Sequence, residues 1–166
     1  NSTQIEGPRD GGGKGSGMDT ERVIIAGFGP VGRALAEALA KHQHEVAIID
    51  TNPRTVRVQQ ALGRRAIHGD VSDPRTLEAA ELNSATALIV TIPDAAKAIQ
   101  ACRVARSLAP SLFIAVRTEF VSEGIAALQS GADSVTVEEI AAAESLAEKV
   151  LGHMALDGRG MCEGAD

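Results

Sequence analysis

Short runs of aliphatic residues alternate along the chain with longer segments in which apolar residues recur every three or four positions. The short runs predict buried β-strands, and the longer segments predict amphipathic helices. The expected strands are residues 23–26, 46–49, 66–68, 87–92, 112–116 and 135–137. The expected helices are residues 31–41, a segment that begins at Pro53, and residues 73–80, 94–108, 123–129 and 138–151, the last ending near Gly152.

This alternation of strands and helices predicts right-handed crossovers and a parallel sheet. We expect a Rossmann-type, doubly wound α/β fold with six strands in the order 3-2-1-4-5-6. The core must be aliphatic, because the chain has no Trp, no Tyr and only three Phe. Parallel strands that are buried on both faces favour such residues.

Glycine-rich and polar ends flank the expected domain. We interpret residues 1–20 as a flexible linker or an added tail, residues 21–152 as a nucleotide-binding domain, and residues 153–166 as a C-terminal tail. A segment as rich in glycine as residues 1–17 buries little apolar area. The sequence leaves open whether residues 1–17 are a native tether.

The net charge of −6 argues against a nucleic-acid partner, because phosphate neutralisation needs clustered Lys and Arg. No stretch approaches the length of a membrane-spanning helix, and the polar start is unlike a signal peptide. Cys102 lies among Ala, Ile and Val at helical spacing, which is typical of a core side chain. We therefore expect a cytoplasmic location.

The first expected strand runs directly into a glycine-rich turn, Gly27-Phe28-Gly29-Pro30-Val31-Gly32, and the first helix follows. In such a turn Gly27 permits the tight bend, Gly29 lets the backbone approach a phosphate, and Gly32 lets helix and strand pack closely. The start of the helix offers free N–H groups and a partial positive charge to an anion. The turn therefore predicts a phosphate-binding site, and we include all six residues in it.

Asp50 closes the second expected strand roughly twenty residues after the glycine turn. A carboxylate there accepts hydrogen bonds from both hydroxyls of an adenosine ribose and repels a 2′-phosphate. Thr51 and Arg54 follow it and are further candidates. An arginine at position 54 can also meet a phosphate or stack on adenine. Because Asp50 is closer to the expected ribose, we favour a ribose without a 2′-phosphate.

The carboxyl ends of the third and fourth strands meet at the same edge, where ligands bind in such sheets. Asp70 follows the third strand, and either accepts a hydrogen bond from the adenine amino group or organises its own turn as an Asx motif. Val71 lies beside it. Thr91, Ile92 and Pro93 end the fourth strand and complete this part of the predicted site.

Arg117 ends the fifth strand and either faces the phosphates or forms a rim ion pair with Glu119. We expect no metal site, because the four histidines have no ligand spacing. No Ser/His/Asp or Cys/His arrangement converges on the glycine turn, so we predict no catalytic residues. Short-chain dehydrogenases need a Tyr-x-x-x-Lys, and this chain has no tyrosine. A small NAD-dependent oxidoreductase, or its cofactor-binding domain, is the alternative to a regulatory domain.

Several further segments carry a family resemblance. They are the glycine turn with its flanking residues 23–33, Ile-Ile-Asp at 48–50, His-Gly-Asp-Val-Ser-Asp-Pro at 68–74, Leu-Ile-Val-Thr-Ile-Pro-Asp at 88–94, Ala-Val-Arg-Thr at 115–118 and Gly-Ala-Asp at 131–133. Over about residues 22–151 the chain resembles the Trk-type N-terminal, or regulator-of-potassium-conductance, nucleotide-binding domain. Within that family it is most similar to the cytoplasmic domain of Kef-type cation/proton antiporters.

The resemblance implies a domain at the cytoplasmic face of the membrane that binds an adenine nucleotide, either NAD(H) or AMP, ADP or ATP. It implies control of a tethered or associated potassium channel, uptake system or antiporter. The family's calcium-gated channels use carboxylates at the end of the fifth strand, and Arg117 stands in one such place here, which argues against a calcium site. We also expect a homodimer or higher homo-oligomer formed through helices 94–108 and 138–151; the alternative is that both helices pack on their own sheet.

Overall fold

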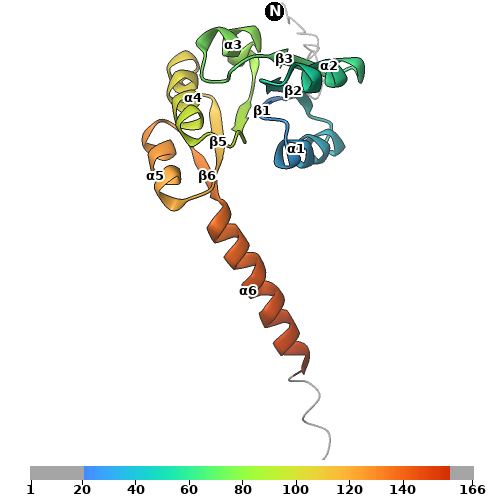
Figure 1. Cartoon of the computed structure of the whole chain (residues 1–166), viewed down its shortest axis with the longest axis vertical. Coiled ribbons are helices and arrows are strands. Elements are labelled where there is room, and N and C mark those ends of the chain that lie inside the picture. Colours follow the sequence, from blue (N-terminus) through green and yellow to red (C-terminus); the bar gives the residue numbers. More distant parts are fainter. Residues whose placement is uncertain (1–20, 158–166) are drawn as a thin grey trace, which may run out of the picture.

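The computed structural model describes residues 21–157, in which helices cover both faces of a six-stranded parallel sheet (Figure 1). The strands are β1 (Arg22–Ala26), β2 (Glu45–Asp50), β3 (Arg65–His68), β4 (Ala87–Val90), β5 (Phe113–Thr118) and β6 (Ser134–Val137). Their order is β3-β2-β1-β4-β5-β6, which confirms the predicted fold and topology. The linker expected over residues 1–20 and the tail residues 158–166 lie outside the described residues.

Helices connect the strands in the expected alternation. They are α1 (Pro30–Lys41), α2 (Pro53–Ala61), α3 (Pro74–Ala79), the 3-10 turn η1 (Leu82–Ser84), α4 (Ala95–Leu108), α5 (Val121–Gln129) and α6 (Glu138–Asp157). Proline begins α1, α2 and α3, because the first helical position needs no N–H donor. The boundaries differ by two residues in places, since β4 ends at Val90 and α5 begins at Val121.

Buried aliphatic side chains form one cluster on each face of the sheet. The smaller cluster joins Ile25 and Ile48 to Ala36 of α1 and Val56 of α2. The larger cluster joins the opposite face to α3, α4 and α5 and includes Cys102, whose thiol pKa is raised by burial to about 11. The expectation that Cys102 is a core residue is confirmed.

Helix α4 packs one face on the chain's own sheet, as expected. Its small side chains Ala98, Ala101, Cys102 and Ala105 are buried in the larger cluster, so they are not free for a second subunit. Ala96 is exposed on another face of the helix, and association through that face stays a prediction.

Helix α6 is longer than predicted. It was expected to end near Gly152 and to leave residues 153–166 as a tail, yet it continues to Asp157. A single glycine inside a helix costs only about 1 kcal/mol, and good helix formers such as Met154 and Leu156 follow it. The helix projects away from the sheet (Figure 1), and its side chains from Glu139 to Leu156 are exposed.

Gly32→Ala should destabilise the fold, because the added methyl group would overlap the carbonyl oxygen of Gly27. Overpacking of this kind costs about 1–3 kcal/mol, and we expect the free energy of unfolding in urea to fall by that amount. Gly29→Ser is the matched control: Gly29 is the N-cap of α1, where serine is favoured, and an added Cβ meets no atom within 4 Å. Equal stability of the two variants would contradict the close contact between Gly27 and Gly32.

Candidate functional site

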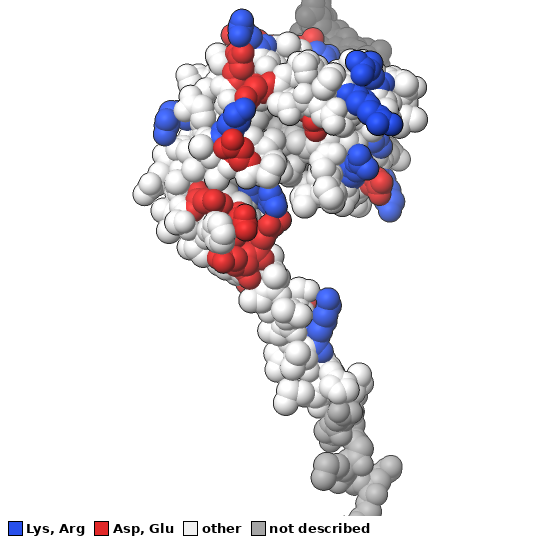
Figure 2. Space-filling view, viewed as in Figure 1, with Lys and Arg blue, Asp and Glu red and all other residues white. Residues whose placement is uncertain are grey.

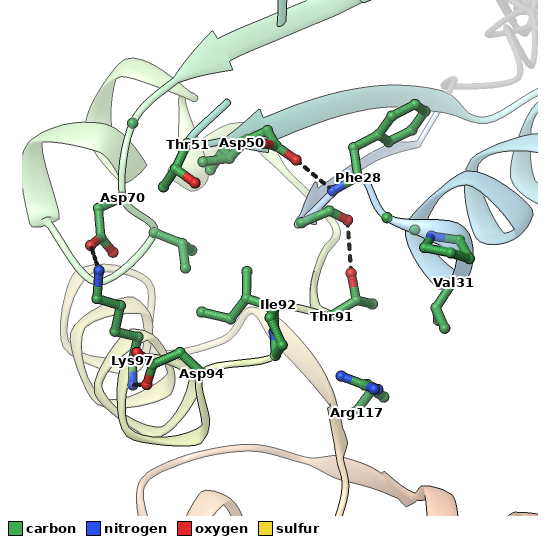
Figure 3. A pocket seen from close by; sticks show the side chains of 18 residues that line it. Phe28, Val31, Asp50, Thr51, Asp70, Thr91, Ile92, Asp94, Lys97 and Arg117 are labelled. Atoms are coloured by element: carbon green, nitrogen blue, oxygen red, sulfur yellow. Dashed lines mark hydrogen bonds and ion pairs between the residues drawn. The ribbon is translucent and has the colours of Figure 1, made fainter. Parts of the chain in front are cut away.

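A cavity of about 440 Å³ (Figure 3) opens at the carboxyl edge of the sheet. It lies beside the point where the strand order reverses between β1 and β4. The loops after β1, β2, β3 and β4 contribute to it, as do the start of α4 and Arg117 near the end of β5. Its lining residues are Gly27, Phe28, Gly29, Pro30, Val31, Gly32, Ile49, Asp50, Thr51, Gly69, Asp70, Val71, Thr91, Ile92, Pro93, Asp94, Lys97 and Arg117. Every residue predicted to bind the ligand lines this cavity, except Arg54.

The glycine turn forms one wall of the cavity. Gly27 has a φ of +97°, which favours glycine, and Thr91 Oγ1 donates a 2.8 Å hydrogen bond to its carbonyl oxygen. Gly32 packs directly against that carbonyl group, so the start of α1 comes close to the end of β1. Gly29, between them, faces open space. The first amide groups of α1 lack partners within the helix and are available to a ligand at this wall.

Asp50 fastens the glycine turn to the end of β2. Its Oδ2 accepts a 2.8 Å hydrogen bond from the backbone N–H of Phe28 (Figure 3), and its Oδ1 accepts a 2.7 Å bond from that of Asn52. Each carboxylate oxygen has a second lone pair, so Asp50 can still accept hydrogen bonds from a ligand in the cavity. The residue predicted to bind ribose therefore also shapes the predicted phosphate loop.

Asp70 forms the Asx motif that the sequence offered as one of two alternatives. Its Oδ1 accepts hydrogen bonds from the backbone N–H and the hydroxyl of Ser72, at 2.9 and 2.6 Å. Its Oδ2 accepts a 2.7 Å bond from Lys97 Nζ in α4. Together, Lys97 first and Ser72 second, these donors lower the pKa of the Asp70 carboxyl from 3.8 to about 2.

Lys97 was missed by the sequence analysis, although a signal for it exists. Asp94 caps α4 by accepting a 3.0 Å hydrogen bond from the backbone N–H of Lys97. Lys97 therefore stands in the first turn after β4, at the edge where the cavity opens. A lysine three residues after the cap of a helix that starts at a ligand-binding edge is a candidate for the site.

Arg117 lines the cavity from the end of β5, but its ion pair differs from the one expected. Its Nε donates a 2.6 Å hydrogen bond to Glu138 Oε1, and not to Glu119. The reason is the neighbouring strand: Arg117 is paired with Thr136 of β6, and that strand ends at the same edge just before Glu138. Glu119 instead offers its backbone N–H to Glu123 in the first turn of α5.

Arg54 is the one predicted site residue that does not line the cavity. Pro53 begins α2 shortly after β2, and the Asn52 side chain accepts a hydrogen bond from the Arg54 backbone N–H, so the chain turns away from the cavity. The Arg54 side chain lines a smaller hollow of about 260 Å³ together with Arg33. Its role toward a ligand stays a prediction.

The charged side chains that line the cavity stand on opposite sides of it. In Figure 3, Asp70 and Lys97 lie on one side, while Val31 and Arg117 lie on the other. Among residues 21–157, no group of three or more potential metal ligands is present. The lining contains no histidine, cysteine or tyrosine. The arrangement suits an elongated ligand that carries hydroxyls near Asp50 and an anionic group at the start of α1.

Comparison with known proteins gives a consistent result. The profile of the TrkA-N domain family matches residues 23–138. The chain is 30% identical over 140 residues to the glutathione-regulated potassium-efflux system protein KefC of Enterobacter sp. (strain 638), a match that covers 84% of this chain and 22% of KefC. The chain spans about a fifth of the length of the curated relatives it matches.

Two solved structures extend the comparison. The TrkA-N domain of the inner membrane protein YbaL from Escherichia coli is 27% identical with a TM-score of 0.75, over 78% of this chain and 96% of that one. The AMP-bound Kef CTD of Shewanella denitrificans is 25% identical with a TM-score of 0.70, over 81% of each chain. Across the described part of this chain, none of the helices has the length and apolar character needed to cross a bilayer.

Lys97→Met should raise the pKa of the Asp70 carboxyl from about 2 toward its ordinary value of 3.8. NMR titration of the Asp70 carboxyl carbon measures this shift, and Lys149→Met in α6 is the control. A pKa that is lowered by folding stabilises the protein above the unfolded value and loses that effect as the pH falls through the folded value. The two variants should therefore differ in stability at neutral pH and converge as the pH falls toward about 2. An unchanged Asp70 pKa in Lys97→Met would contradict the ion pair.

Proposed function

Because this chain belongs to the TrkA-N domain family, we propose that it binds an adenine nucleotide at the carboxyl edge of its sheet and thereby regulates potassium transport across a membrane. One observation carries the proposal. The glycine turn leaves open space at Gly29 beside a cavity, and Asp50 stands at the carboxyl end of the neighbouring strand, at the same cavity. This is the arrangement that holds the phosphate and ribose of a nucleotide in sheets of this topology.

The ligand would lie across the strand ends. Its phosphate would accept hydrogen bonds from the first amides of α1 beside Gly29, and its ribose hydroxyls would donate to Asp50. The base would lie between Val71 and Ile92, with Asp70 at its edge. NAD(H), AMP, ADP and ATP share the adenosine and first phosphate that these residues would contact. The AMP bound to the Kef relative of Shewanella denitrificans supports this choice of ligand class.

We propose that the domain acts by binding and not by turnover. The lining residues contain no histidine, cysteine or tyrosine to move a proton or attack a substrate. The curated relatives are several times longer than this chain, and KefC is a protein of a potassium-efflux system. A membrane transporter of potassium, with this domain on its cytoplasmic side, is therefore the partner that we propose.

Self-association is the second part of the proposal, and α6 supports it. With 3.6 residues per turn, the exposed side chains of Ile140, Leu146, Val150 and Met154 fall on one side of the helix. Ser145 falls on the opposite side. Figure 2 shows acidic side chains gathered where α6 leaves the sheet, while most of the helix beyond is uncharged. Such an apolar stripe is typical of a helix that packs on a partner, and we propose a second copy of this chain.

Gly29→Asp should abolish nucleotide binding and leave the fold intact. The new side chain would enter open space, and aspartate is a favoured N-cap, but its charge would occupy the phosphate position. Calorimetric titration with AMP measures the loss. Gly152→Asp, which adds the same charge in α6 away from the cavity, should bind AMP like the wild type. A Gly29→Asp variant with wild-type affinity would place the site elsewhere.

Val150→Glu should shift the chain from a dimer toward a monomer, because a carboxylate in an apolar interface must be desolvated. Sedimentation at tens of micromolar protein measures this change, with and without AMP. Ser145→Glu is the control, since it adds the same charge to the opposite side of α6. A wild-type chain that stays strictly monomeric under both conditions would defeat the proposal of self-association.

A further inference from the structure

The guanidinium of Arg117 stands between the cavity and the first residue of α6. Its Nε donates the 2.6 Å hydrogen bond to Glu138 Oε1, and the side chain also lines the cavity. A guanidinium has five N–H donors. Within residues 21–157, its two terminal nitrogens have no hydrogen-bond partner, so they remain available on the cavity side. Figure 3 shows Arg117 below Val31, on the glycine-turn side of the cavity.

Glu138 is where α6 is fastened to the sheet. Strand β6 ends at Val137 and the helix begins at the next residue, with Glu138 partly buried. Beyond this residue the described side chains of α6, from Glu139 to Leu156, are exposed. The hydrogen bond to Arg117 therefore acts on the end of α6 that adjoins the sheet.

We propose that Arg117 is a positioning residue that joins a bound nucleotide phosphate to the first turn of α6. Its terminal nitrogens donate to a phosphate oxygen while Nε holds Glu138. The proposal rests on the nucleotide binding proposed above and adds a route by which binding reaches the association helix. Arginine suits this role, because its rigid planar fork donates in two directions at once.

The coupling follows from the side-chain freedom of Arg117. Without a ligand, the guanidinium is held on one side only, by a partly exposed pair whose side chains are 24% and 41% accessible. A phosphate on the other side fixes the guanidinium and so favours the positions of α6 in which Glu138 is held. A ligand shifts such an equilibrium only through this difference in contacts. The nucleotide favours the held positions of α6 by some factor, and by linkage those positions favour the nucleotide by the same factor. Loss of Glu138 should therefore lower the nucleotide affinity by up to that factor.

Two single variants separate the two contacts of Arg117. Arg117→Gln removes both, and we expect AMP affinity to fall roughly tenfold or more, the scale for a hydrogen bond to a charged group. Glu138→Ala removes only the link to α6, because alanine has no side-chain acceptor for Arg117 Nε, and we expect AMP affinity to fall by at most about fivefold, as for an exposed ion pair. Glu139→Ala is the matched control, because Glu139 is exposed and forms no hydrogen bond or ion pair within the described residues.

Hydrogen exchange of the amides in the first turns of α6, measured with and without saturating AMP, tests the proposal. AMP should slow this exchange severalfold in the wild type and in Glu139→Ala, and should leave it unchanged in Glu138→Ala, which calorimetry shows to be loaded with AMP. The same slowing in loaded Glu138→Ala would overturn the role of Arg117 while leaving nucleotide binding intact. No AMP binding by the wild type in calorimetry would overturn the nucleotide proposal itself, and the coupling with it.

Discussion

The carboxyl edge of this sheet depends on the contact between the Gly27 carbonyl group and Gly32, which leaves no room for a side chain at position 32. This contact sets the direction in which α1 leaves β1 and so fixes where its free amides point. Two neighbouring strands secure the turn, through Thr91 on one side and Asp50 on the other. The wall of the cavity is therefore held by three strands, and its geometry is inseparable from the packing of the fold.

Much of this arrangement follows from the sequence, because parallel strands bring their carboxyl ends to one edge. Once the strands ending at Ala26, Asp50, His68 and Val90 are recognised, the residues that follow them must meet. The glycine turn, Asp50 and Asp70 could therefore be placed in one cavity without coordinates. Strand order follows equally well, because the alternation of elements allows few topologies.

The rest depends on side chains that meet across space. Lys97 reaches Asp70, and Arg117 reaches Glu138, only because the helices after β4 and β6 start at the same edge. Periodicity also cannot tell which apolar helix is covered: α4 and α6 look alike in sequence, yet α4 is buried on the sheet and α6 is exposed. Glycine at position 152 was an equally ambiguous signal, since it ends some helices and is tolerated inside others.

The exposure of α6 has a consequence for folding as well as for binding. In proteins most of the stability of a helix comes from packing of its apolar face, and within the described residues α6 beyond Glu138 is exposed. If α6 packs on a second copy, as proposed, the stability of residues 138–157 depends on how much of the protein is present. The sheet would then fold within one chain, while the helicity of α6 would rise with protein concentration.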